Sequence, residues 1–324
     1  MKKQKDATAI GFVFLGMVVF YLGLAFLIPL LSNWGIKLPA TIVLLLGEIP
    51  LILPGIIYLC WNKVSIRDVG YRMPKIRTLL LSVVLGFISM PIASLFNLIS
   101  QLFVSNTVAQ NSEVLLEGGA INVLLVSSVV APMVEEFVCR GVLFHSIKRL
   151  STPRKGILMS AFCFGLIHLN FNQFLYAFAL GIIFAVIVHV SKSIWTSIIV
   201  HFTINAVNML MVMVATKVYE GRGESLAQSA EVARANIVML IMSIAIYSGI
   251  SVVATILMIL ILRYIAKVEG TTGELTALIK KREKTVKSDD TDVLMDEEEK
   301  EPRVFFNVPM ILGVIICIVI MVID

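Results

Sequence analysis

The sequence predicts an all-α protein, a bundle of eight or nine transmembrane helices. Of its 324 residues, 58% are hydrophobic and 15% are charged, whereas soluble domains average about 45–50% and about 25%. The hydrophobic residues also gather in runs close to the roughly 20 residues that cross a bilayer. These two observations exclude a soluble fold class.

Nine apolar segments are candidate spans, and the fifth is short enough to be a half-span or a re-entrant helix. Glycine and proline inside them do not argue against helix, because membrane helices tolerate both. We interpret the first as an uncleaved signal anchor, since its apolar run exceeds the roughly 7–15 residues of a signal peptide. The segments are 8–32, 38–61, 78–104, 121–147, 156–169, 173–191, 194–215, 236–263 and 304–323.

Basic residues mark every second loop between these spans. They gather in "MKKQKD" and after the second, fourth and sixth spans, whereas "SNWGIK", "SNTVAQNSEVLLEGGA" and "LNFNQ" hold one basic residue between them. The positive-inside rule then predicts a cytoplasmic N-terminus. The loop after the seventh span fits less well, because it contains Lys217, Arg222 and Arg234. The net charge of +5 is explained by these loops and indicates no nucleic-acid partner. The "KK" start favours a bacterial plasma membrane.

The chain divides into five predicted parts. The one long polar stretch has a basic block, "KKREK", followed by an acidic one, "DDTDVLMDEEEKE". It is typical of a solvated cytoplasmic linker, with contact between its basic block and anionic lipid as the alternative. The last span lies beyond this linker as an appendage. The parts are N-terminal transmembrane helices (1–119), core helices with the polar motifs (120–215), a further loop and helix (216–263), the charged linker (264–303) and a C-terminal helix (304–324).

Three ionisable residues interrupt the fourth span, in "VVAPMVEEFVCRGVLFHSI". A charge at the centre of a bilayer costs about 2.5 kcal/mol or more. Residues four apart share a helix face, so Glu136 and Arg140 are expected to form an ion pair. Glu135 points about 100° away, which leaves a carboxylate free for chemistry.

Polar residues of two later spans lie at a similar depth. Glu135 and His168 are each about 20 Å from the basic end of their spans at 1.5 Å per residue, and His201 and Asn205 are about 14 and 20 Å from theirs. Phe164 shares a helix face with His168. Three helices are thus expected to bring a carboxylate, two imidazoles and an amide together.

This set of groups suits hydrolysis by two routes. A carboxylate and an imidazole can activate water and pass its proton to a leaving amine, while an imidazole and an amide stabilise an oxyanion. Alternatively, Glu135, His168 and His201 suit a catalytic zinc. The four cysteines form no CxxC pair, so no zinc ribbon or disulfide framework is indicated. The residues alone leave open an intramembrane hydrolase or a proton-coupled transporter, although we find no inverted repeat of the kind many transporters have.

The motifs at these positions resemble those of the CPBP family, which comprises type II CAAX prenyl endopeptidases and bacteriocin-processing and immunity (Abi) proteins. The family pattern EExxxR, FxxxH and HxxxN stands here as "EEFVCR" (135–140), "FGLIH" (164–168) and "HFTIN" (201–205). All three occur in order, each in an apolar span, and the resemblance covers residues 120–210. It implies a helical bundle with an intramembrane active-site cavity.

The resemblance also implies a role for each motif residue. Glu135 resembles the general base, with His168 as its partner, and His201 and Asn205 resemble the oxyanion-stabilising pair. Glu136 and Arg140 resemble structural residues. Phe164 is expected to pack beside the site.

We therefore expect an intramembrane endopeptidase that cleaves a peptide or lipidated protein at the membrane lipid, with zinc or with no metal. Such a protein would be a metalloprotease or a glutamate-type protease. The alternative from another class is a non-catalytic immunity or scaffold protein of the same fold. Deleting the last span is expected to spare activity.

Overall fold

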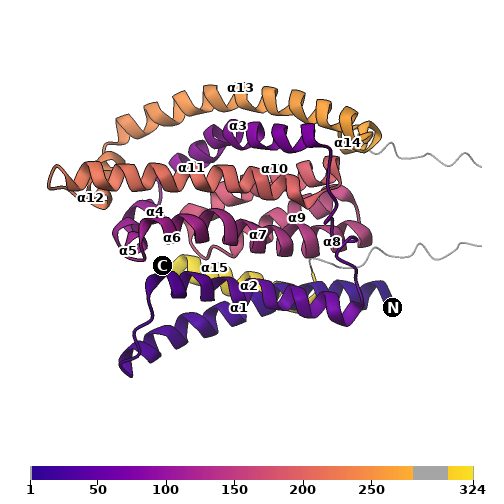
Figure 1. The fold of residues 1–324 in the computed structure, drawn as a ribbon, viewed down its shortest axis with the longest axis horizontal. Coiled ribbons are helices and arrows are strands. Elements are labelled where there is room, and N and C mark those ends of the chain that lie inside the picture. Colours follow the sequence, from indigo (N-terminus) through magenta and orange to yellow (C-terminus); the bar gives the residue numbers. More distant parts are fainter. Residues whose placement is uncertain (1, 280–305, 324) are drawn as a thin grey trace, which may run out of the picture.

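The computed structural model describes residues 2–279 and 306–323, and every regular element within them is helical (Figure 1). Seven helical segments are long and apolar enough to cross a membrane. They are α1 (Lys2–Asn33), α2 (Ala40–Asn62), α3 (Ile76–Ser100), the run Ala120–Leu150, α10 (Phe171–Ser191), α11 (Ile194–Glu220) and α13 (Ile237–Glu269). The chain is thus a polytopic helical bundle and an integral membrane protein, as predicted.

The two remaining predicted segments form shorter helices. The fifth is α9 (Pro153–Leu166), with 14 residues, and the ninth is α15 (Val308–Ile323), with 16. Four more helices lie in connections that were expected to be loops or linker. They are α4 (Thr107–Gln110), α5 (Ser112–Leu116), α12 (Leu226–Ala235) and α14 (Thr272–Ile279).

The predicted start of the charged linker at residue 264 is wrong. Helix α13 continues to Glu269, because Leu262, Ile265 and Ala266 are buried against the core and hold its last turns. Helix α14 then occupies the next residues. Residues 280–303 of the predicted linker lie outside the described residues.

The interpretation of the last span as an appendage is also wrong. Helix α15 packs along α1 and also contacts α9. Its Met310 and Cys317 are fully buried in the same hydrophobic cluster as Phe14 of α1. The helix therefore completes one side of the core.

The helices form successive layers, seen in Figure 1. Helix α13 covers α3, which packs on α10 and α11. Helix α10 also packs on α9, and α1 packs on α2 and α15. Two large hydrophobic clusters result, one containing Val134 and Phe137 and the other containing Phe164. The polar motifs lie where these clusters meet.

Side-chain caps fix the starts of the helices that carry the later motifs. Thr152, Asn170 and Ser193 each accept a hydrogen bond from a backbone N–H in the first turn of α9, α10 and α11, respectively. Such caps satisfy N–H groups that the helix leaves free. Helix α10 ends at Ser191 and is capped by Lys192, whose backbone is left-handed, so α10 and α11 turn sharply into an antiparallel pair.

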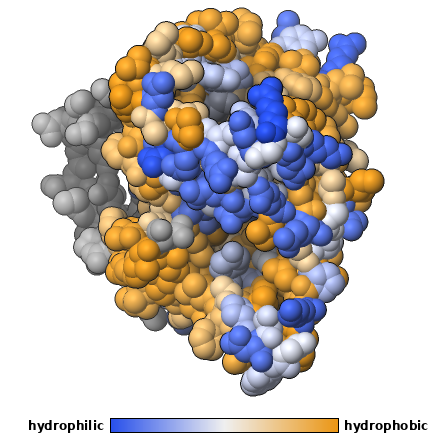
Figure 2. All heavy atoms as spheres, turned by 90° about the vertical axis from the view of Figure 1, so that its left-hand side faces the viewer, coloured by the Kyte–Doolittle hydropathy of each residue, from blue (hydrophilic) through white to orange (hydrophobic). Residues whose placement is uncertain are grey.

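The two ends of the bundle differ in charge. The basic loops meet the end of α13 and α14, where Lys192 Nζ lies 2.6 Å from Glu274 Oε1 and Arg154 Nε donates to Leu278 O at 3.0 Å. Figure 2 views the opposite end, around α12, where hydrophilic side chains gather in the centre and hydrophobic ones surround them. This arrangement suits a protein whose sides face lipid and whose ends face water.

Candidate active site

The helical run Ala120–Leu150 carries the two adjacent glutamates and is not a uniform α-helix. It consists of α6 (Ala120–Leu125), η1 (Val126–Val130), α7 (Ala131–Glu136), η2 (Phe137–Phe144) and α8 (His145–Leu150). The η segments are π-helical, a wide geometry that often occurs at functional sites. Glu135 and Glu136 stand at the junction between α7 and η2. Pro132, which lacks a backbone N–H, follows η1 and interrupts the regular α-helical hydrogen bonding there.

The predicted ion pair between Glu136 and Arg140 is present. Arg140 Nη1 lies 2.8 Å from Glu136 Oε1, and both side chains are fully buried. The guanidinium also lies over two aromatic rings, 4.2 Å from the centroid of Phe164 and 4.9 Å from that of Phe184. Stacking on ring faces is a favourable setting for a desolvated guanidinium. The cation is therefore held by one carboxylate and two rings.

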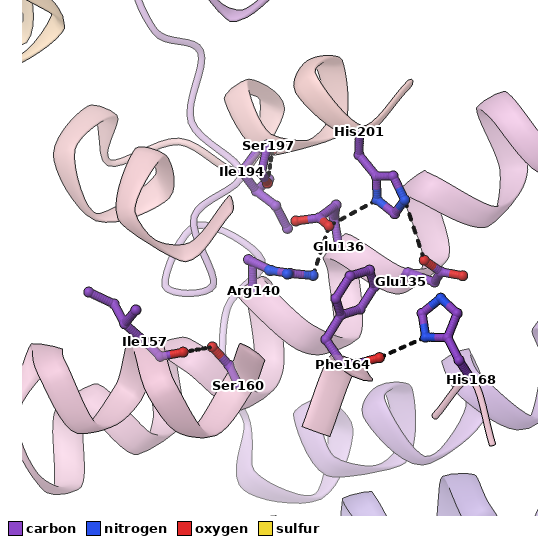
Figure 3. Close-up of polar contacts among 10 residues, drawn as sticks. All are labelled: Glu135, Glu136, Arg140, Ile157, Ser160, Phe164, His168, Ile194, Ser197 and His201. Carbon is purple, nitrogen blue, oxygen red and sulfur yellow. Dashed lines mark hydrogen bonds and ion pairs between the residues drawn. The ribbon is translucent and has the colours of Figure 1, made fainter. Parts of the chain in front are cut away.

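His201, on α11, lies between the two glutamates (Figure 3). Its Nδ1 is 3.1 Å from Glu136 Oε1, and because a carboxylate only accepts hydrogen bonds, Nδ1 is the donor. In the neutral ring, Nε2 is then left without a proton, 3.6 Å from Glu135 Oε2. Phe184 stacks on the His201 ring with centroids 4.9 Å apart. The sequence did not indicate that His201 would contact both carboxylates.

His168 follows α9 and is oriented by its own helix. Its Nδ1 donates to Phe164 O at 2.8 Å, so Nε2 of the neutral ring is again the acceptor. Figure 3 shows the ring pointing toward the Glu135 carboxylate, although no direct hydrogen bond joins these two side chains among the described contacts. The Phe164 ring packs edge-on against both imidazoles, with centroids 5.2 Å from His168 and 5.6 Å from His201. Phe164 thus packs at the site, as expected.

Asn205 lies one turn beyond His201 and contacts a different partner. Its Nδ2 donates to Ser127 O at 2.9 Å, which fastens α11 to the π-helical segment η1. An amide nitrogen has a second N–H, so this contact leaves one donor for another acceptor. The oxyanion role predicted for His201 and Asn205 stays a prediction.

A polar turn supports His168. Asn170 Nδ2 donates to His168 O at 2.9 Å, and Asn172 Nδ2 donates to Asn97 Oδ1 at 2.7 Å and to Ser100 Oγ at 2.8 Å. These bonds tie the turn after α9 to the end of α3. The "LNFNQ" segment is therefore a hydrogen-bonded turn that fixes the position of His168.

Three residues near the site were not singled out from the sequence. Phe184 left no signal, because an aromatic residue in an apolar span is ordinary. Tyr71 packs against Phe137 and Trp195, and its burial and then the charge of Glu136 raise the pKa of its phenol. Glu48 on α2 did leave a signal, since an ionisable residue inside a span suggests function.

The donor atoms do not form a three-ligand metal set in this arrangement. Across residues 2–279 and 306–323, no three His, Cys, Asp or Glu side chains lie together as a metal site requires. The zinc ligands predicted from the sequence, Glu135, His168 and His201, thus do not meet around one point. The zinc alternative stays a prediction.

Comparisons with known proteins find matches in one part of the chain. Residues 117–207 match the family model described as type II CAAX prenyl endopeptidase Rce1-like. The chain is also 30% identical over 88 residues to a Bacillus subtilis (strain 168) protein described as "Putative membrane peptidase YdiL", a match that covers 27% of this chain and 36% of that relative. No solved structure matches the chain. The family match contains Glu135, Glu136, Arg140, Phe164, His168, His201 and Asn205. The Rce1-like family model thus matches the part of the chain that holds all three motifs, in agreement with the resemblance.

Proposed function

We propose that this chain is an intramembrane endopeptidase that hydrolyses a peptide bond of a peptide or lipidated protein at the membrane. One observation carries the proposal: the Glu135 carboxylate, whose side chain is 15% exposed, faces the unprotonated Nε2 of His201, with the His168 ring pointing at it from the other side. The Rce1-like domain and the peptidase relative support the same class of reaction. The match covers only 36% of that relative, so activity and substrate are both proposed.

In this mechanism Glu135 acts as the general base. It takes a proton from water as the oxygen attacks the peptide carbonyl, and the proton passes through His168 Nε2 to the amine when the C–N bond breaks. The second N–H of Asn205 donates to the oxyanion, and His201 joins it as a donor when its Nε2 carries a proton taken from bulk water before the reaction. Glu136 and Arg140 hold His201 in place without touching the substrate.

The experiment is cleavage of quenched-fluorescent peptides, lipidated and unlipidated, by protein in liposomes. Glu135→Gln and His168→Ala are expected to lower kcat/KM by at least about 100-fold, the usual contribution of general acid–base groups. Glu113→Gln, at an exposed position on α5, is the matched control and should retain full activity. Cleavage that survives in both site variants would refute the catalytic roles.

A chelator arm tests the metal alternative. We propose that water is activated by Glu135 without a metal, so activity should persist in a strong chelator. Loss of activity that zinc restores would instead assign Glu135, His168 and His201 as ligands after a rearrangement of the site. The protein would then be a metalloprotease.

The rival function is a non-catalytic immunity or scaffold protein of the same fold. It would tolerate Glu135→Gln, because glutamine fills nearly the same volume. Complementation of a deletion strain by this variant separates the two functions: full complementation favours the rival. The donors and acceptors that gather around Glu135 favour the enzyme.

We further propose a bacterial plasma membrane and a cytoplasmic N-terminus. The basic loops that follow α2, α8 and α10 gather at one end of the bundle, where Lys75 N donates to Glu269 Oε1 at 2.9 Å. This clustering supports the orientation expected from the positive-inside rule. Labelling of introduced cysteines with a membrane-impermeant reagent tests it, and labelling in the loop of residues 63–75 from outside intact cells would reverse the orientation.

A further inference from the structure

Glu48 is a membrane-buried carboxylate that the proposed mechanism does not use. It lies on α2, and its Oε2 atom is buried without a hydrogen-bond partner in the described structure. Ionisable side chains inside membrane spans are costly and generally face a partner or a functional site. The helices that pack against α2 indicate which site Glu48 is near.

Helix α2 brings Glu48 to the edge of the candidate active site. The helix packs against both α7 and η2, the segments that meet at Glu135 and Glu136. Leu51, one turn from Glu48, lies with Ile167 and Leu169, the two residues that flank His168. The charge of Glu48 also acts on Glu135. Glu48 therefore lies on the helix that packs against the two segments meeting at Glu135 and Glu136.

An apolar groove leads along α2 toward this position. Ile52 and Ile56 follow Glu48 at intervals of four residues, so the three share a helix face. Both isoleucines line a cavity of about 700 Å³ between α2 and the Ala120–Leu150 run, which Val130 and Val134 line from the other side. Val134 directly precedes Glu135. An apolar segment in the groove would thus extend toward the end at which Glu48 and Glu135 lie near lining residues in the sequence.

The carboxylates near Glu135 outnumber the cations that could neutralise them. The charged groups that act on Glu135 are Glu48, Glu136 and Arg140, and Arg140 is already paired with Glu136. The second oxygen of Glu136 also lacks a hydrogen-bond partner among the described residues. In surroundings of low dielectric, a cation placed between two such carboxylates gains far more than it would in water.

We propose that Glu48 binds a basic side chain of the substrate, so that the enzyme selects peptides with a lysine or arginine beside an apolar segment. The apolar segment occupies the groove along α2, and the ammonium or guanidinium group meets the Glu48 carboxylate next to the scissile bond. This inference rests on the proposed peptidase function and names its substrate class.

The test uses apolar decapeptides of Leu, Ala and Val with one scanned position, occupied by lysine, norleucine or glutamate. Norleucine keeps most of the lysine stem and removes the charge. With the full-length protein in liposomes, lysine at the preferred position should raise kcat/KM at least tenfold over norleucine, chiefly through KM. Glu48→Gln should bring this ratio close to one. Glu117→Gln, at an exposed position that does not line the groove, should leave the ratio unchanged.

Binding measurements with the same peptides, fluorescently labelled, separate the peptidase function from the selection of a basic side chain by Glu48. Tighter binding of the lysine peptide that Glu48→Gln abolishes, without any cleavage, would support the inference and refute the peptidase function. Cleavage without a lysine preference, or with a preference that Glu48→Gln retains, would refute the inference and leave the function standing. Failure of all the peptides to bind would also overturn the inference.

Discussion

Glu136 uses one carboxylate oxygen to accept hydrogen bonds from two side chains, Arg140 at 2.8 Å and His201 at 3.1 Å. The first bond compensates a charge that is fully buried, and the second selects the tautomer of the imidazole. Because Nδ1 of His201 carries the proton, Nε2 faces Glu135 as an acceptor. One buried carboxylate therefore sets both the electrostatics and the proton positions of the site.

Removing Arg140 should destabilise the protein strongly. Arg140→Leu would leave Glu136 buried without its cation, a change that typically costs about 3–5 kcal/mol. Arg140→Lys should recover only part of the loss, since an ammonium lacks the planar group that stacks on Phe164 and Phe184. Thermal unfolding in detergent measures both. The double variant Glu136→Gln/Arg140→Met is the control and should be more stable than Arg140→Leu, because it buries no unpaired charge; an equal loss would refute the electrostatic explanation.

At the scale of elements, the close packing of α9 and α10 depends on Gly181. A Cβ atom at this position would lie 2.9 Å from the Cα of Ala161 and 3.2 Å from Arg140 Nη2. The first neighbour is backbone and cannot move without its helix. The glycine thus lets α10 approach α9 while Arg140 lies between their aromatic rings.

Gly181→Ala should therefore separate α9 from α10 and displace Arg140. Overpacking of this kind costs about 1–3 kcal/mol, and peptide cleavage should fall as well, because His201 depends on the same cluster. Gly249→Ala is the matched control, since no atom lies within 4 Å of the Cβ it would add. Thermal stability and kcat/KM are measured for both variants. Equal behaviour of the two would show that the α9–α10 contact is looser than described.

Helix α14 is attached to the core by a contact that depends on pH. Its Glu274 meets Lys192 at 2.6 Å and His189 Nε2 at 3.2 Å, and its pKa is lowered, chiefly by the hydrogen bond from Lys192. A carboxyl whose pKa is lowered by folding stabilises the folded state above its ordinary pKa of 4.5, and this contribution is lost as the pH falls further.

Acidification below pH 4.5 should therefore loosen α14 before the bundle unfolds. The hydrogen-exchange protection factors of residues 272–279 should fall in this range, whereas those of α10 should not. Glu274→Gln should already show fast exchange at neutral pH and little further change in acid. Protection of α14 that stays constant down to pH 3 would refute the role of Glu274.

At the scale of the whole molecule, the sequence predicts contacts within a helix better than contacts between helices. The spacing of Glu136 and Arg140 was enough to predict their ion pair, since four residues make about one turn. The meeting of His201 with both glutamates, and the stacking of Phe184 on His201, arise from packing between α10, α11 and the Ala120–Leu150 run. The π-helical turns likewise depend on tertiary context. A hydropathy profile shows neither which helices pack together nor where a helix becomes π-helical.

The position of α15 gives the last prediction, because the sequence separates this helix from the bundle and the structure joins it to the core. Asn307 Nδ2 donates to Ala7 O of α1 at 3.1 Å, and the Phe14 ring lies 2.8 Å from where a Cβ on Gly313 would be. None of the candidate site residues lies on α15. A chain truncated after residue 305 should therefore unfold at a lower temperature but cleave peptides with an unchanged kcat/KM per folded molecule. Gly313→Leu, which would press on Phe14, should have the same effect in the full-length chain. A truncated chain that stays folded yet loses cleavage would show that α15 acts on the site itself.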